Sequence, residues 1–238
     1  MTKKSIRTKY DFNKILSLAY ILKQYVQVSD DYVVNLVAKN GNSTVVFQGL
    51  SYNRGIDISN YSGFENRHIS FYTETANEDR FWEKIKEYKL FPNPKDHKIL
   101  FIFRDPVKRL LSAKNTGAAW YFDKNMDEYL DIIREAFEDG KPRLIDQHVY
   151  PQFPYLIKNN LWIEDIHLFI DLEDYQEFCI ENNIPWILAN KNTKQEYLNT
   201  GITKEQEDRI KSLYADDYKM IDLIKNSGKL YKPKKNKL

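Results

Sequence analysis

Residues 98–115, KILFIFRDPVKRLLSAKN, join the clearest buried strand of the sequence to a helix. The opening KILFIF is almost entirely apolar, and such a run predicts a strand buried on both faces, as in a parallel sheet. Pro106 stands in the favoured first position of a helix, with Asp105 before it as the N-cap. Arg104 therefore leaves the carboxyl end of a buried strand, where ligands gather in open α/β sheets.

Strands and helices alternate on both sides of this stretch. The apolar patterns predict the following further elements: strands at 31–38, 67–74 and 163–170, and helices at 10–27, 77–91, 126–140, 172–183 and 203–225, with another helix starting near 45. Alternation of this kind indicates an α/β fold, with a mainly parallel central sheet flanked by helices on both faces. We expect one domain over 1–238, with an N-terminal helical extension over 1–30. The basic tail at 229–238 is expected to be a frayed, solvated end.

Composition narrows the class of protein. The 238 residues are 42% hydrophobic and 29% charged, which is ordinary for a globular domain. The formal charge of +2 gives no general attraction to nucleic acid or membrane. Cys179 is the only cysteine, so an intramolecular disulfide is impossible, and we expect a packed core thiol. The N-terminus lacks a continuous apolar segment, so we expect no membrane anchor and a cytoplasmic location.

The strand-to-helix turn in residues 34–47, VNLVAKNGNSTVVF, has the composition of an anion-binding loop. A glycine among small polar residues lets backbone N–H groups converge on an anion, and the following helix adds its positive dipole end. Lys39 supplies a full charge beside this turn. The order is not that of a Walker A loop, because Lys39 precedes Gly41. An ordinary Asn-Gly turn explains this stretch equally well.

The second candidate anion site combines Arg104 with Ser112. Ser112 lies eight residues further on, about two turns into the helix. A phosphate could accept a charge-assisted hydrogen bond from Arg104 and another from the Ser112 hydroxyl. Alternatively, Arg104 pairs with Asp105 or a nearby acid, and Ser112 only packs.

Together these segments resemble the sulfotransferases that use 3′-phosphoadenosine 5′-phosphosulfate (PAPS), particularly the carbohydrate sulfotransferases. That family has a PKxGxTS-like loop after one strand and an RDPxxRxxS motif after a later one. The matching residues here are Lys39, Gly41, Ser43 and Thr44 in the first motif, and Arg104, Asp105, Pro106, Arg109 and Ser112 in the second. DQHVYPQF at 146–153 resembles the family's HxxPQ segment, and the final predicted helix resembles its closing helix, in which a tyrosine and acidic residues recur.

The resemblance implies a P-loop-like sulfotransferase fold and transfer of a sulfuryl group from PAPS to an acceptor hydroxyl, with a glycan favoured and no metal. The donor-binding residues that it implies are Lys39, Asn40, Gly41, Asn42, Ser43, Thr44, Arg104 and Ser112. The loop would grip the 5′-phosphosulfate, while Arg104 and Ser112 would bind the 3′-phosphate. Lys39 would also neutralise charge on the departing nucleotide.

A general base is needed for the acceptor hydroxyl, and histidine suits because its ordinary pKa lies near 6.5. His68 is favoured, since some related enzymes place a catalytic histidine between the two phosphate motifs. His148 of the HxxPQ-like segment is the second choice. His97, before a predicted strand, and His167, inside one, are expected to be structural.

Three alternatives remain at this stage. A P-loop-type nucleotide kinase or NTPase would have a similar architecture, although the Walker order is absent. A non-catalytic module that binds a nucleotide or glycan would retain the same motifs. The motif matches could also be coincidental in an unrelated α/β domain.

Overall fold

The structure, a computed structural model, describes residues 25–37, 40–41, 44–45, 48–49, 51–52, 94–115, 121, 123–139, 145, 147–158, 162–186 and 201–234. The elements in these ranges are β1 (Tyr25–Gln27), β2 (Tyr32–Asn35), η1 (Pro94–Asp96), β3 (Lys98–Phe103), α5 (Pro106–Asn115), α6 (Met126–Glu138), η3 (Gln147–Val149), α7 (Phe153–Lys158), β4 (Leu168–Asp171), η4 (Leu172–Asp174), α8 (Tyr175–Glu181), α9 (Lys204–Leu213) and α10 (Ala215–Asn226). In the described part of the chain, no helix is long and apolar enough to cross a membrane.

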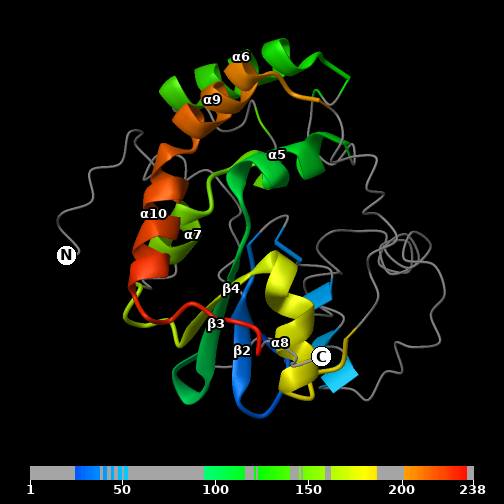
Figure 1. Ribbon diagram of the computed structural model, residues 1–238, viewed down its shortest axis with the longest axis vertical. Coiled ribbons are helices and arrows are strands. Elements are labelled where there is room, and N and C mark those ends of the chain that lie inside the picture. Colours follow the sequence, from blue (N-terminus) through cyan, green and yellow to red (C-terminus); the bar gives the residue numbers. More distant parts are fainter. Residues whose placement is uncertain are drawn as a thin grey trace.

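Among the described residues, the centre of the fold is a four-stranded mixed sheet in the order β1-β2-β3-β4, and the strand predicted at 67–74 lies outside them (Figure 1). β3 pairs in parallel with β2 and with β4, while β1 is antiparallel to β2. Leu100 of β3 lies opposite Val34 on one side and Leu168 on the other. The α/β class and the predominance of parallel pairing are confirmed.

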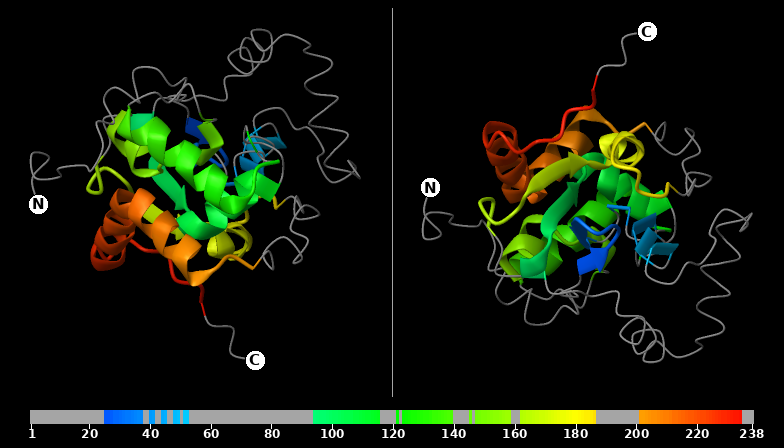
Figure 2. Two further views of the ribbon diagram at one scale, coloured as in Figure 1. Left: turned by 90° about the horizontal axis from the view of Figure 1, so that it is seen from above. Right: turned by 90° about the horizontal axis from the view of Figure 1, so that it is seen from below.

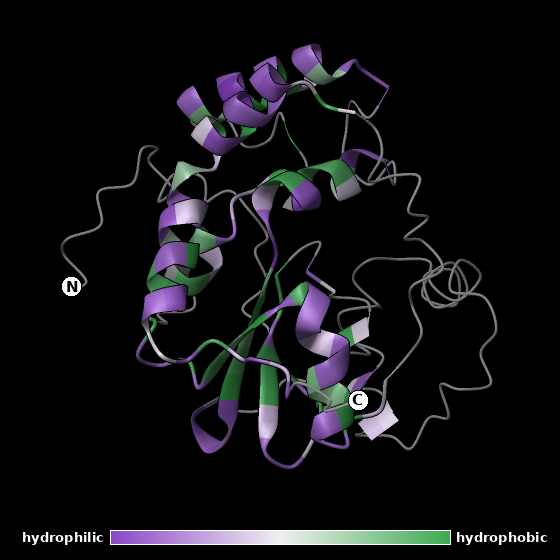
Figure 3. Cartoon of the chain, viewed as in Figure 1, coloured by the Kyte–Doolittle hydropathy of each residue, from purple (hydrophilic) through white to green (hydrophobic). Residues whose placement is uncertain are grey.

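The strands alternate between two apolar clusters, one on each face of the sheet. Phe101, Phe103 and Phe169 pack with residues of α5, α6, α7, α9 and α10. Leu100, Ile102 and Ile170 pack on the other face with residues of α8. In Figure 1, α7 and α10 accordingly lie on one side of the strands and α8 on the other. Figure 3 shows the strands as largely hydrophobic and α6 and α9 as mostly hydrophilic.

The stretch that decides the fold is correctly predicted. β3 covers KILFIF, and α5 begins at Pro106 as expected. The backbone N–H of Lys108 donates to Oδ1 of Asp105 at 3.0 Å, so Asp105 caps this helix. The described residues between 44 and 52 are also helical, as expected from the sequence.

Two predicted boundaries are wrong. Residues 25–27 form β1 rather than the end of a helix over 10–27, and the rest of that predicted helix lies outside the described residues. The strand predicted at 163–170 begins only at Leu168, because residues 163–165 form a turn in which Asp165 accepts a hydrogen bond from the backbone N–H of Trp162. His167 therefore precedes β4 instead of lying inside it.

The helix predicted over 203–225 is two helices, which meet at Tyr214. α9 packs against α5 and α6, whereas α10 packs against α7, and one straight helix could not reach both groups of neighbours (Figure 1). The break buries the ring of Tyr214, which packs edge-on against Phe137 at a centroid distance of 5.9 Å. Thr203 caps α9, as predicted.

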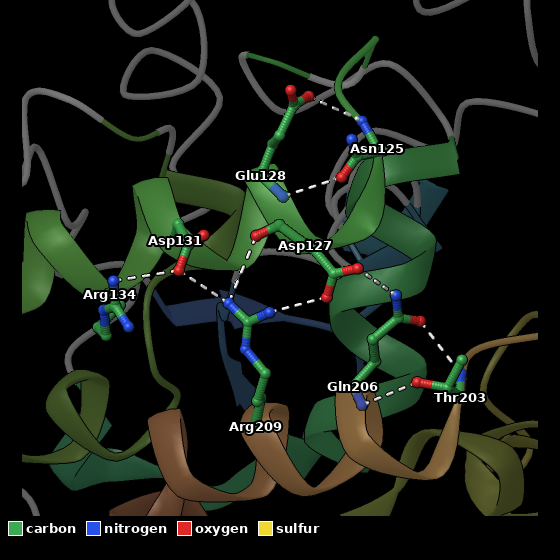
Figure 4. A network of polar contacts seen from close by, with 8 residues as sticks. All are labelled: Asn125, Asp127, Glu128, Asp131, Arg134, Thr203, Gln206 and Arg209. Carbon is green, nitrogen blue, oxygen red and sulfur yellow. Dashed lines mark hydrogen bonds and ion pairs between the residues drawn. The ribbon is translucent and has the colours of Figure 1, made fainter.

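Polar contacts join α6 to α9, which run side by side (Figure 2). Arg209 of α9 donates to Oδ1 of Asp127 at 2.7 Å and to Oδ1 of Asp131 at 2.9 Å. Gln206, which completes the capping box of α9, also donates to Asp127, at 3.0 Å. Figure 4 shows this network together with the capping box of α6.

Residues 229–231 are ordered against the sheet, contrary to the prediction of a solvated tail that begins at residue 229, whereas 235–238 lie outside the described residues. Phe169 of β4 donates to the Lys229 carbonyl at 2.9 Å, and its own carbonyl accepts from Tyr231 at 2.8 Å. Nζ of Lys229 donates to three carbonyls of the turn before β4, those of Ile163, Glu164 and Ile166. The side chains of Leu230 and Tyr231 thus pack against the apolar clusters, while the ammonium group of Lys229 donates hydrogen bonds.

Candidate anion-binding site

The two segments identified from the sequence meet at one edge of the sheet. β2 and β3 are parallel, so their carboxyl ends lie at the same edge. Asn40 and Gly41 follow β2, and Arg104 follows β3 directly. Lys39, Asn42 and Ser43 of the first segment lie outside the described residues.

Gly41 has the backbone conformation that a tight loop requires. Its φ is +80°, and a Cβ added there would lie 2.9 Å from Cδ1 of Leu172 in η4. The Gly41 carbonyl accepts from the backbone N–H of Val45 at 3.0 Å, which starts the following helix, and Thr44 is buried in its first turn. This turn presents a helix N-terminus at the edge of the sheet, as an anion site requires.

Arg104 is a desolvated cation at the end of β3. The residue is 9% exposed, and its Nε has no hydrogen-bond partner among the described residues. Burial lowers the pKa of Arg104 from its ordinary value, while the charge of Glu173 acts in the opposite direction. No carboxylate within the described ranges forms an ion pair with it. A buried cation with an unused donor is stabilised by a bound anion.

Asp105 is not the partner of Arg104. Its Oδ1 caps α5, and its Oδ2 accepts from the Tyr218 hydroxyl at 3.3 Å. No ion pair joins Arg104 to Asp105 or to another acid of the described residues, although burial, which lowers the pKa of Arg104, is opposed by the charges of Glu173, Asp171 and Asp105, which raise it. Ser112 is half-buried in the second turn of α5.

Gln152 connects the two segments. Its side chain is fully buried, and Oε1 accepts from Nδ2 of Asn40 at 2.6 Å and from the backbone N–H of Arg104 at 2.9 Å. Its Nε2 donates to the Arg104 carbonyl at 2.7 Å. Asn40 Nδ2 also donates to the Ile102 carbonyl at 2.9 Å, so this loop is bound to β3 directly at Ile102 and to Arg104 through Gln152.

The loop that carries Gln152 is itself held from two helices. Arg109 of α5, which is 1% exposed, donates through Nη1 to the Tyr150 carbonyl at 2.5 Å. The Tyr214 hydroxyl donates to the Val149 carbonyl at 2.6 Å, and Asp217 of α10 accepts from the backbone N–H of Gln152 at 2.8 Å. The second arginine of the RDPxxRxxS-like motif thus supports this loop.

Of the two candidate bases, the structure describes only His148. His148 is half-buried in η3, which packs against α5. His68 lies outside the described residues. The choice of base therefore stays a prediction from the sequence.

Gln152 and Asp217 were not singled out from the sequence as site residues. Both residues nevertheless lie in stretches that resemble the family. Gln152 ends the HxxPQ-like segment, and Asp217 is one of the acidic residues of the closing helix. Neither stretch indicates on its own that the two are hydrogen-bonded.

In comparisons with known proteins, no family model matches the chain, and neither the curated proteins nor the solved structures give a match.

Proposed function

We propose that this protein is a sulfotransferase with a P-loop-like sulfotransferase fold, and that it moves the sulfuryl group of PAPS to an acceptor hydroxyl. The observation that carries the proposal is the environment of Arg104: a buried residue at the end of β3, with an unused Nε donor and no ion pair to an acid of the described residues. This position is the one at which the resemblance expects the 3′-phosphate of the donor.

The residues present fit such a donor. Arg104 supplies a charge-assisted hydrogen bond to the 3′-phosphate, and Ser112 on the same strand–helix unit supplies a hydroxyl. The Gly41 turn and the helix after it supply backbone N–H groups to the 5′-phosphosulfate. The role of Lys39 rests on the sequence resemblance.

In the proposed reaction, the bond between sulfur and the bridging oxygen of the donor breaks while the acceptor oxygen bonds to sulfur. Catalysis depends on positioning and charge stabilisation, as in the closely related phosphoryl transfers. Lys39 balances the charge on the departing nucleotide oxygen. The acceptor proton passes to a base, for which His68 is the first candidate and His148 the second.

The acceptor follows only from the family resemblance, which favours a hydroxyl of a glycan. The loop at 114–125 carries three consecutive aromatic residues, and we propose it as part of the acceptor pocket. Tyr121 in that loop is 39% exposed and has a φ of 63°, whereas Trp120 and Phe122 lie outside the described residues. An exposed aromatic ring can stack on a sugar ring.

Calorimetric titration with 3′-phosphoadenosine 5′-phosphate, ADP and ATP tests the donor site. We expect micromolar binding of the 3′-phosphorylated nucleotide and much weaker binding of the other two. Arg104→Ala should remove this preference, with a loss of roughly tenfold to a hundredfold in affinity, whereas Arg134→Ala, which alters an exposed arginine on α6, should not. No binding, or a preference for ATP with magnesium, would contradict the proposal and favour the kinase alternative.

Turnover is tested separately with Lys39→Ala. A sulfotransferase with this variant should lose far more rate than donor affinity, since the lysine acts on the developing charge. A chain that binds 3′-phosphoadenosine 5′-phosphate but transfers no sulfuryl group to any acceptor in a screen of sugars would instead be a non-catalytic binding module.

A further inference from the structure

The side chain of Gln152 uses all of its hydrogen-bonding positions. An amide has one oxygen that accepts twice and one nitrogen that donates twice. Here Oε1 accepts from Asn40 and from the Arg104 N–H, while Nε2 donates to the Arg104 carbonyl and, at 3.4 Å, to Oδ2 of Asp217. A carboxylate of the same shape has no donor, so glutamate would place an oxygen against two acceptors.

We infer that Gln152 is a positioning residue that sets the separation between the Asn40–Gly41 loop and Arg104, so that one ligand with two phosphate-like groups binds both segments at once. The inference rests on the proposed function, because it requires that each segment binds one end of the same nucleotide. Gln152 contacts the backbone of one segment and a side chain of the other, and it need not touch the nucleotide to act.

The advantage of binding two groups of one ligand depends on the geometry. Once one end is bound, the second binds at a high effective concentration, which increases affinity by ~10²–10⁴ when the spacing fits and by nothing when it does not. A displacement of about 1 Å is enough to affect such a site strongly. A residue that fixes the spacing therefore controls the gain from the second phosphate rather than the binding of either one.

The anchoring of Gln152 is suited to this role. Its backbone N–H donates to Asp217 at 2.8 Å, and the adjacent Phe153 N–H donates to the other oxygen of the same carboxylate at 2.8 Å. Arg109 holds the Tyr150 carbonyl from the opposite helix. The side-chain amide of Gln152 and the carboxylate of Asp217 both have their hydrogen-bond partners, and these bonds fix the position of the amide relative to α10.

The test compares two nucleotides on each protein: 5′-AMP, which carries one phosphate, and 3′-phosphoadenosine 5′-phosphate, which carries two. The ratio of their dissociation constants is the factor gained from the 3′-phosphate. For Gln152→Glu in the full chain, we expect this factor to fall at least ~tenfold while the affinity for 5′-AMP changes less than about threefold. Gln152→Met removes the same side-chain hydrogen bonds without introducing a charge, and it should give the same signature.

Gln48→Glu is the matched control, because it makes the same change at another fully buried glutamine. Gln48 bonds to Tyr175 and to the Pro185 carbonyl, not to either candidate phosphate-binding segment. In Gln48→Glu, the gain in affinity from the 3′-phosphate should equal the gain in the unaltered chain. Circular dichroism of each variant separates a change in binding from loss of fold, and Gln152→Met carries the test if Gln152→Glu does not fold.

The outcomes separate this inference from the function on which it rests. If the unaltered chain binds 3′-phosphoadenosine 5′-phosphate no better than 5′-AMP, the proposed donor site and the role of Gln152 are both wrong. If the unaltered chain shows the preference and the folded Gln152 variants keep it, only the positioning role is wrong. Equal weakening for both nucleotides also contradicts it, since that pattern indicates a general structural role.

Discussion

The carboxylate of Asp217 accepts hydrogen bonds from the backbone of Gln152 through one oxygen, and from that of Phe153 through the other, both at 2.8 Å. Burial raises the pKa of Asp217, while these bonds and the charge of Arg109 act in the opposite direction. The buried carboxylate of Asp217 therefore serves as the acceptor for the two backbone N–H groups of Gln152 and Phe153.

Asp217→Ala should destabilise the protein by about 2–5 kcal/mol, because two buried N–H groups lose their acceptor at about 1–3 kcal/mol each. Urea denaturation followed by circular dichroism measures the change in the free energy of unfolding. Asp222→Ala makes the same substitution at an exposed position of α10 and should change stability by less than about 0.5 kcal/mol. Equal effects of the two variants would show that the Asp217 bonds contribute little.

Gly41→Ala should lower stability by about 1–2 kcal/mol, because a residue with a Cβ is strained at a φ of +80°. The contact with Cδ1 of Leu172 adds less, since that atom is the end of a flexible side chain. The double variant Gly41→Ala, Leu172→Ala separates the two causes. If removing Leu172 restored full stability after correction for the single Leu172→Ala variant, the contact rather than the backbone would be the cause.

Cys179 should be unreactive in the native protein. The thiol is fully buried, and burial raises its pKa from 9.0 to about 11, although a hydrogen bond from Gln48 acts in the opposite direction. At pH 8 we expect reaction with Ellman's reagent to be at least ~100-fold slower than in urea. Rapid labelling of the folded chain would contradict the burial of this residue.

The same shift gives a pH dependence of stability with a defined sign. The folded-state pKa of Cys179 is above the unfolded value, so the native state retains a proton that the unfolded chain loses. The stabilisation is fully present below about pH 9 and is lost as the pH rises to about 11. Since tyrosines titrate nearby in pH, the measurement is the difference between the unaltered chain and Cys179→Ala. That difference should decrease across this window.

Arg209→Met should destabilise by about 1 kcal/mol and should matter less at high salt. Arg209 bridges two carboxylates of α6, but all three side chains are partly or largely exposed, so screening limits the gain. Unfolding at 0.05 M and 1 M NaCl measures both effects. Arg134→Met, which removes one ion pair within α6, should cost only a few tenths of a kcal/mol.

The sequence predicted the elements whose signals are local. KILFIF is apolar throughout, and Asp105 and Pro106 stand together as an N-cap and a first helical residue, so β3 and α5 are correctly placed. Thr203 likewise marks the start of α9. These features depend on neighbouring residues in the chain and on no tertiary contact.

The errors occurred where distant contacts decide the structure. Nothing near Tyr214 breaks a helix, and the break follows from packing of α9 and α10 against different partners. The basic composition of 229–238 predicts a solvated tail, whereas hydrogen bonds to Phe169 order its first three residues. The link from Gln152 to Asn40 joins residues 112 positions apart, which no local pattern indicates.

The pairing of Leu230 with Phe169 has a consequence for synthesis on the ribosome. β4 is translated well before the segment that covers its outer side, and at ordinary elongation rates the delay is roughly 3–12 s. During that interval the nascent chain presents an unprotected strand edge, which is the kind of surface that pairs with other chains. Chaperone demand on this protein should therefore be greatest between translation of β4 and translation of the residues after α10.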